Sequence, residues 1–133
     1  MKTIVNQPIA KTFGWLHVNG TEIDLPETGA PVALTLSEGE ERTMLLAPDA
    51  SLEASLSENA ALKLIQVRKD AGGQTAGKIR VRCGKKARFE WYLIVLNGDA
   101  TFADCSAELE GEESSFLGVI GYRLEGKNKL DIN

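Results

Sequence analysis

Three residues carry the side chains best suited to chemistry in this sequence: His17, Cys83 and Cys105. The cysteines do not form a Cys-x-x-Cys motif, and a soft metal ion or an iron–sulfur cluster usually takes four thiolate or imidazole ligands. Both cysteines lie on the apolar side of alternating segments, which predicts buried, protonated thiols that are poor nucleophiles. We therefore predict no metal site and no cofactor within one chain; a site shared across a dimer is the alternative.

A catalytic Ser-His-Asp or Cys-His arrangement would have to use His17, the only histidine. This residue lies within the alternating run Trp15–Val18, which favours a surface or capping role on a lead-in strand. The sequence shows no other acid–base constellation. We predict that the protein is not an enzyme and has no catalytic residue.

Two charged runs could bind ions. The first is basic and the second acidic: Lys78, Arg80, Arg82, Lys85, Lys86 and Arg88, then Glu108, Glu110, Glu112 and Glu113. A phosphate could bind the first and a hard cation the second, but the acidic run lacks the spacing of a calcium loop. We favour a solvated outer face on which the two runs balance. The net charge of −4 argues against nucleic acid and against an anionic membrane as partners.

The elements that must position these residues show the period of β-strands. Apolar and polar residues alternate over Val32–Leu36, Leu52–Leu56, Ile79–Cys83 and Cys105–Leu109. A short polar turn follows each of them, and then a more apolar strand: Thr43–Ala47, Leu62–Val67, Arg88–Leu96 and Phe116–Leu124. Longer connections, notably Lys69–Gly77 and Asn97–Asp99, return the chain. A helix over Asp49–Ala61, capped by Asp49, is the less favoured alternative.

Equivalent positions recur with spacings in the twenties, from Leu36 to Leu56, from Cys83 to Leu109 and from Phe89 to Phe116. Such a period predicts a solenoid, in which each strand pair buries its inner face by stacking on its neighbours. The Cys83-to-Leu109 spacing would set Arg82 beside Glu108 and Lys78 beside Asp104. An antiparallel β-sandwich or jelly roll is the alternative, since Asn97-Gly98 is a hairpin turn signal.

Two segments, Val81–Trp91 and Cys105–Gly118, resemble the SufB/SufD family, the scaffold subunits of the SUF iron–sulfur cluster assembly system. The run Leu109–Gly118 is the most family-like, and Thr12–Gly20 resembles the family's lead-in. The resemblance implies a right-handed, single-stranded parallel β-helix of about four to five coils. It also implies a scaffold that pairs with a SufB-like subunit and docks an ABC-type ATPase. The cluster-related residues of the family's later coils have no counterpart here, so no functional residue is carried over.

The strand expected over Arg88–Leu96 is apolar on both sides, which is typical of a strand buried on both faces. On its outer side we predict a partner or dimer surface, which the next strand continues: Tyr92, Ile94, Leu96, Leu117 and Val119. The open edge of the last coil is a second reason to expect a homodimer. Coverage of this surface by the segment around Phe13–Val18 is the alternative.

These observations predict a single all-β domain with a lead-in over residues 1–31 and a core over residues 32–133. The expected function is a non-enzymatic scaffold or binding protein that acts through protein association. The alternative is an accessory protein that carries a metal or an iron–sulfur cluster on cysteines across a dimer. No apolar run is long enough to span a bilayer, and Met1–Pro8 lacks the apolar region of a signal peptide, so we expect a cytoplasmic protein.

Overall fold

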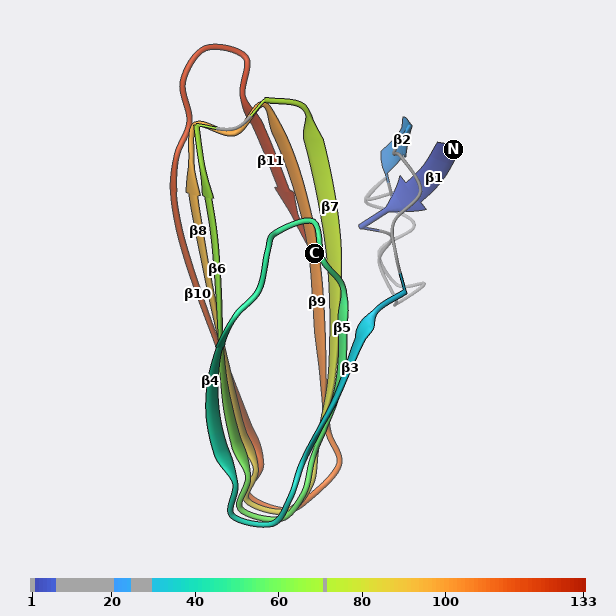
Figure 1. Cartoon of the computed structure of the whole chain (residues 1–133), viewed down its shortest axis with the longest axis vertical. Helices are drawn as coiled ribbons and strands as arrows, with labels where there is room; N and C mark the ends of the chain where they lie inside the picture. Colours follow the sequence, from blue (N-terminus) through green and yellow to red (C-terminus); the bar gives the residue numbers. More distant parts are fainter. Residues whose placement is uncertain (1, 7–20, 25–29, 71) are drawn as a thin grey trace, which may run out of the picture.

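The computed structural model describes residues 2–6, 21–24, 30–70 and 72–133. Every regular element in these ranges is a β-strand, and they contain no helix. Two parallel sheets face each other along the long axis of the molecule, and a small antiparallel sheet lies to one side (Figure 1). The all-β expectation is therefore confirmed.

Consecutive strands of the core alternate between the two sheets. One sheet has four strands: β4 (Glu41–Leu45), β6 (Ala61–Lys69), β8 (Arg88–Leu96) and β10 (Ser115–Arg123). The other has five: β3 (Val32–Leu36), β5 (Leu52–Leu56), β7 (Gln74–Cys83), β9 (Ala100–Leu109) and β11 (Lys129–Ile132). Every neighbouring pair in both sheets is parallel, so the antiparallel sandwich is wrong for the core. Asn97-Gly98 carries the chain from β8 to β9 in the opposite sheet instead of closing a hairpin.

The ladder registers match the predicted spacings. Leu56 lies opposite Leu36 on one side and Cys83 on the other, and Cys83 in turn lies opposite Leu109. Arg82 is beside Glu108, as expected from this register. Lys78–Asp104 and Phe89–Phe116 are also neighbours. The helix alternative over Asp49–Ala61 is wrong, because this segment contains β5 and its flanking turns.

Strand boundaries differ from the predicted ones by a few residues, most clearly at Gln74–Gly77. These residues belong to β7 and pair with Ala100–Ala103, although the sequence suggested a connection. The first half of β7 extends past β5, and the connection from β4 to β5 crosses at this level (Figure 1). A side chain at Gly77 would collide with the carbonyl oxygens of Pro48 and Ala50. Position 77 thus requires glycine because another part of the backbone approaches it closely. In the sequence, such a glycine looks the same as one that marks a loop.

Inward-facing side chains form one continuous hydrophobic core between the sheets. Its most completely buried members come from β3 to β8: Leu36, Leu52, Leu62, Leu64, Ile79, Val81, Cys83, Phe89, Leu93 and Val95. Because the strands are in register, each inner residue packs on an inner residue of the next strand. Burial of these rows is the main favourable term in folding.

Short turns join the sheets at one end of the molecule, and they stack as the strands do. Residues with positive φ occur at equivalent turn positions, namely Gly39, Asn59, Lys86 and Glu113. Backbone N–H groups at three of them donate to carbonyls of the next turn, as in Asn59 N to Lys85 O at 2.9 Å. A Cβ on Gly111 would collide with the backbone of Gly84 and Lys85. The polar turns therefore continue the hydrogen-bonded stacking of the sheets.

The antiparallel pair β1 (Lys2–Val5) and β2 (Thr21–Asp24) lies on the side of the five-stranded sheet (Figure 1). Asn6 Nδ2 donates to the backbone oxygen of Asp131 at 2.7 Å and to its Oδ1 at 3.0 Å. The N-terminal segment is therefore attached to β11. His17, the segment around Phe13–Val18 and the family-like run Thr12–Gly20 lie outside the described residues.

Candidate functional site

The outward side of the four-stranded sheet collects apolar residues that the sequence analysis found only in part. Alternation along each strand places one apolar set outside and the core set inside. The outer set, called the outer apolar face below, consists of Leu45, Ile65, Val67, Tyr92, Ile94, Leu96, Leu117 and Val119. Leu45 is 76% exposed and Leu117 49% exposed. Exposed apolar residues that gather on one surface typically mark an interaction site.

Parallel register brings these residues together in rows that cross the sheet. Leu45, Ile65, Tyr92 and Val119 form one row, one residue from each strand. Val67 lies beside Ile94 in the next row. The five predicted surface residues thus share one face with Leu45, Ile65 and Val67, which were not predicted. Alternation along β4 and β6 could have identified these three, because each of them alternates with inward-facing residues and therefore points outward.

Charged residues border the outer apolar face at the amino ends of the strands. Lys63 Nζ lies 3.5 Å from Glu90 Oε2 and 5.9 Å from the centre of the Tyr92 ring. The Tyr92 hydroxyl donates to the same Glu90 oxygen at 3.3 Å. Arg88 and Glu41 form a second ion pair at 3.5 Å. The face is therefore an apolar surface with a polar margin, which is the usual anatomy of a protein interface.

The terminal strand β10 pairs on one side with β8 and is the edge of its sheet. On its inner side Phe116, Ile120 and Tyr122 remain 41%, 39% and 66% exposed. Phe116 stacks on Phe89 with ring centres 5.3 Å apart, so the core continues to this edge. An edge strand with apolar residues on both sides is a second surface suited to association.

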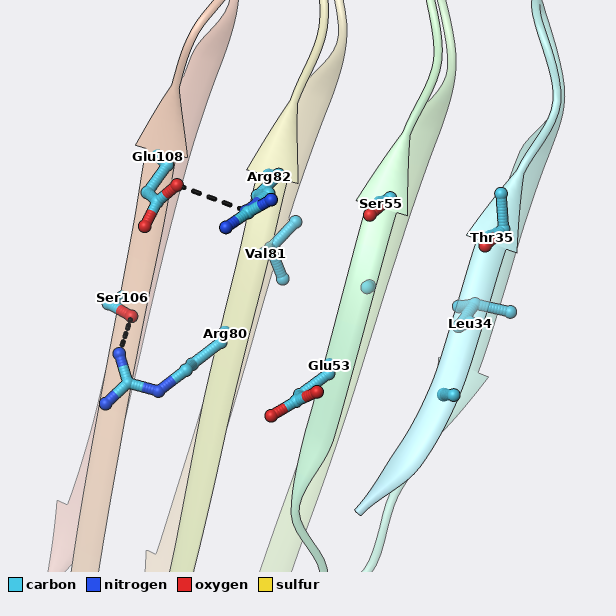
Figure 2. Close-up of a pocket in the computed structure, with 11 residues that line it drawn as sticks. Leu34, Thr35, Glu53, Ser55, Arg80, Val81, Arg82, Ser106 and Glu108 are labelled. Carbon is cyan, nitrogen blue, oxygen red and sulfur yellow. Dashed lines mark hydrogen bonds and ion pairs between the residues drawn. The ribbon is translucent and has the colours of Figure 1, made fainter.

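The outward side of the five-stranded sheet is polar where β3, β5, β7 and β9 lie side by side. This side carries a shallow groove of about 440 Å³. Figure 2 shows Arg80 and Arg82 extending there from β7 towards β9. Arg82 Nε lies 3.3 Å from Glu108 Oε2, and an Arg80 amino group donates to Ser106 Oγ at 3.3 Å. Arg82 thus balances an acidic residue on the next strand, as the charged runs suggested.

Both cysteines face inward, as predicted. Cys83 is fully buried and Cys105 half-buried. Desolvation by burial raises the pKa of Cys105 to about 12, with a further increase from the nearby Asp104 carboxylate. Burial likewise raises the pKa of Cys83, and Glu110 adds to the shift. Both thiols are protonated near neutral pH, so their nucleophilic and metal-binding capacity is low.

The two thiols are too far apart to bind one ion together. Cys83 pairs with Leu109 and Cys105 with Ile79, which sets them about 13 Å apart along the strands. In the part of the chain that the structure describes, no cluster of three or more histidine, cysteine and acidic residues could hold a metal ion. A site shared across a dimer stays a prediction.

A buried arginine that the sequence analysis did not find lies between the sheets. Arg68 has the inward phase of β6 and donates to the backbone oxygens of Gly73 at 2.7 Å and Ala100 at 3.2 Å, and to the Thr75 hydroxyl. Desolvation lowers its pKa, an effect that Asp99 and Asp49 oppose. These contacts attach the β6–β7 connection to β9, which makes Arg68 a structural residue. The sequence does contain a sign of this burial, because Arg68 lies at the same alternating positions of β6 as the buried Leu62 and Leu64.

Comparison with protein families gives one result. The family described as SUF system FeS cluster assembly, SufBD core domain, matches residues 27–133. The chain belongs to this family. SufBD membership places it in iron–sulfur cluster assembly and confirms the resemblance drawn from Val81–Trp91 and Cys105–Gly118.

Two further comparisons bear on the SufBD chain. No curated protein and no solved structure matches it. Within the described ranges, no helix has the length and apolar character needed to cross a bilayer.

Proposed function

We propose that this SufBD-family chain is a non-enzymatic scaffold in iron–sulfur cluster assembly and acts through protein association. The observation that carries the proposal is the family match over residues 27–133. The outer apolar face and the edge strand β10 supply surfaces through which a scaffold could bind partners. The protonated state of both thiols also fits a role other than thiol chemistry.

The fold we propose for the scaffold is a right-handed parallel β-helix. Each return from one parallel strand to the next passes through a strand of the opposite sheet, as from β3 through β4 to β5. Connections of this kind between parallel strands are right-handed in about 98% of cases. The described core would contain four such strand pairs, with β11 beginning a fifth.

The proposed partners are a second copy of the chain, a SufB-like subunit and an ABC-type ATPase of the SUF system. Self-association would use the outer apolar face, the edge strand β10, or both. The cytoplasm is the proposed compartment, since free Cys83 and Cys105 suit a reducing environment.

Affinity purification of the tagged chain from cells that express a SUF ATPase tests the assembly role. We expect the ATPase to be retained by the wild-type chain and lost when Ile120 and Tyr122, on the exposed edge strand β10, are both replaced by glutamate. The matched control replaces Ser55 by glutamate on the polar groove and keeps the ATPase bound. Failure of the wild-type chain to retain either the ATPase or a SufB-like subunit would contradict the scaffold proposal.

Anaerobic reconstitution with iron and sulfide separates the scaffold from a cluster carrier. We expect the purified chain to stay colourless, because its thiols are buried, protonated and about 13 Å apart. A visible charge-transfer absorption that disappears in the Cys105→Ala variant would instead support a cluster held by cysteines across a dimer.

A further inference from the structure

We propose that a second copy of this chain packs face to face on the outer apolar face, about a twofold axis parallel to the strands and midway between β6 and β8. The inference rests on the self-association proposed above and specifies its surface and geometry. It starts from the strand order β10-β8-β6-β4, in which β6 and β8 are the two central strands.

A twofold axis along the strands reverses the strand order and keeps the strand direction. It therefore sets β6 over β8 of the second copy and β4 over its β10. Residues of one row stay at the same level, because the axis does not shift the strands lengthwise. Two sheets packed in this way form a sandwich about 10 Å thick, with strand directions within about 30°.

This arrangement sets apolar residues over apolar residues. Ile65 lies over Tyr92 of the second copy, since both belong to the same row on opposite sides of the axis. Val67 lies over Ile94 by the same relation. At the margin, Leu45 lies over Val119. The twofold repeats each contact, so the rows of Ile65 and Val67 are buried from both sides. In the last row of β6 and β8, at the rim, Leu96 lies over Lys69 of the second copy.

The charged margin fits the same geometry. Lys63 and Glu90 share a row and are 3.5 Å apart within one copy. The axis sets Lys63 over Glu90 of the second copy and Glu90 over its Lys63. Four charges of alternating sign then form a closed network, and complementary charges of this kind fix the register of an interface.

The alternative twofold axis, perpendicular to the strands, gives poorer complementarity. It sets each strand over the same strand of the second copy and reverses the strand direction. A row on one side of the row of Ile65 and Tyr92 then faces the row on its other side in the second copy. Val67 would then lie over Lys63 of the second copy, and Ile94 over Glu90. Each contact would bury a charge against an apolar side chain, which is unfavourable.

The face is large enough for a stable contact. Four strands about 4.8 Å apart, of which β6, β8 and β10 are nine residues long and β4 is five, give a face of about 500 Å². Two such faces bury roughly 1,000 Å², which is about the area that a specific interface needs. The parallel sheet also gains the covering that parallel sheets normally have on both sides.

Analytical ultracentrifugation of the full chain tests the surface. We expect a wild-type dimer at micromolar concentration and at least about a 100-fold weaker dimer for Val67→Glu, because a carboxylate would be buried near the axis. The control Tyr122→Glu changes the inner side of β10 and should remain dimeric. Far-ultraviolet circular dichroism verifies that each variant is folded, and Leu117→Glu repeats the test at a more exposed position.

The outcomes of this experiment separate the two proposals. A dimer that Tyr122→Glu dissociates, and that neither Val67→Glu nor Leu117→Glu weakens, overturns the face-to-face geometry and leaves self-association intact through the edge strand. A wild-type monomer at micromolar concentration overturns both the homodimer and its geometry, and assigns the face to another occupant.

Cross-linking with a short bismaleimide tests the axis. In the double variant Leu45→Cys/Val119→Cys, the two cysteines of one chain are three strands apart, about 14 Å, while those of opposite copies face each other. We expect a covalent dimer from the double variant and none from either single variant or from the wild-type chain. If both single variants were cross-linked, each strand would lie over the same strand of the second copy, and the proposed axis would be wrong.

Discussion

The outward sides of the two parallel sheets are built by the same chain and share one core, yet they differ in chemistry. Over β5 and β7 the five-stranded sheet presents Glu53, Arg80 and Arg82 to solvent. In the outward phase of β6 and β8 the four-stranded sheet presents Ile65, Val67 and Ile94. Inner rows of both sheets are mostly apolar and belong to one core. The contrast therefore does not serve the folding of one chain.

Part of the difference follows from what covers each sheet. Phe102 points outward from β9 but is only 2% exposed, and its ladder neighbour Asp131 is bound by Asn6. Apolar character on the five-stranded sheet thus occurs where the chain's own N-terminal segment is attached. On the four-stranded sheet, Leu45 and Leu117 stay exposed. We infer that this second surface is the one that serves association.

The comparison predicts first that inner and outer leucines of neighbouring strands contribute very differently to stability. Leu93→Ala should lower the free energy of unfolding by about 2–5 kcal/mol, because Leu93 is 1% exposed and its removal leaves a cavity. Leu117→Ala should cost less than about 1 kcal/mol in the monomer, since its side chain is half in water. Urea unfolding at low protein concentration measures both values, and equal costs would contradict the division into inner and outer rows.

A smaller loss is expected from the polar contact inside the core. Trp91 Nε1 donates to Gln66 Oε1 at 2.8 Å in a buried position. Gln66→Leu keeps the volume but leaves the indole N–H without its acceptor, at a cost of about 1–3 kcal/mol. The control Glu53→Gln on the solvated face should change unfolding by no more than about 0.5 kcal/mol. A Gln66→Leu variant as stable as the wild type would show that the contact contributes nothing.

Thiol labelling sharpens the comparison between inward and solvated positions. Because the pKa of Cys105 is about 12 in the folded protein, its thiol should react with an aromatic disulfide at pH 8.5 at least about tenfold more slowly than in urea. The Cys83→Ala variant isolates the signal of Cys105. Equal labelling rates in the folded and unfolded states would contradict the inward placement.

The same raised pKa has a consequence for stability. Folding favours the neutral thiol, so its contribution is fully present below the unfolded pKa near 8.5 and is lost as pH rises towards 12. The Cys105→Ala variant should therefore lose less stability than the wild type between pH 8.5 and pH 12. A steeper alkaline loss in the variant would contradict this assignment.

The smallest effect is expected on the charged face. Arg82 and Glu108 are both more than half exposed, so a double-mutant cycle with alanine should give a coupling of about 0.2–1 kcal/mol. The coupling should vanish in 1 M salt, where the screening length is about 3 Å. For Lys63 and Glu90 we expect a larger, less salt-sensitive coupling in the dimer. Equal couplings at both pairs would remove the distinction between the two faces.

Sequence patterns predicted the core more reliably than the surfaces. Alternation around Ile79–Cys83 and the recurrence of Leu36 at Leu56 were enough for the register, because stacking repeats one local pattern. The strand at Gln74–Gly77 escaped prediction, since its pairing depends on β9 and its glycine on a carbonyl contact. Arg68 escaped for a similar reason, because its acceptors come from the β6–β7 connection and from β9.

From the amino-acid order alone follow the all-β character, the inward phase of both cysteines, the pairing of Arg82 with Glu108 and the family. The first three depend on period-two alternation and on a repeat that neighbouring strands share, and the family depends on the motifs at Val81–Trp91 and Cys105–Gly118. Local pattern is sufficient for all four. Only the tertiary structure decided that Leu45, Ile65 and Val67 join the five predicted residues in one surface, and that the N-terminal segment is attached to the other sheet. The physical reason is that a face depends on which strands become neighbours, and contacts distant in sequence determine that order.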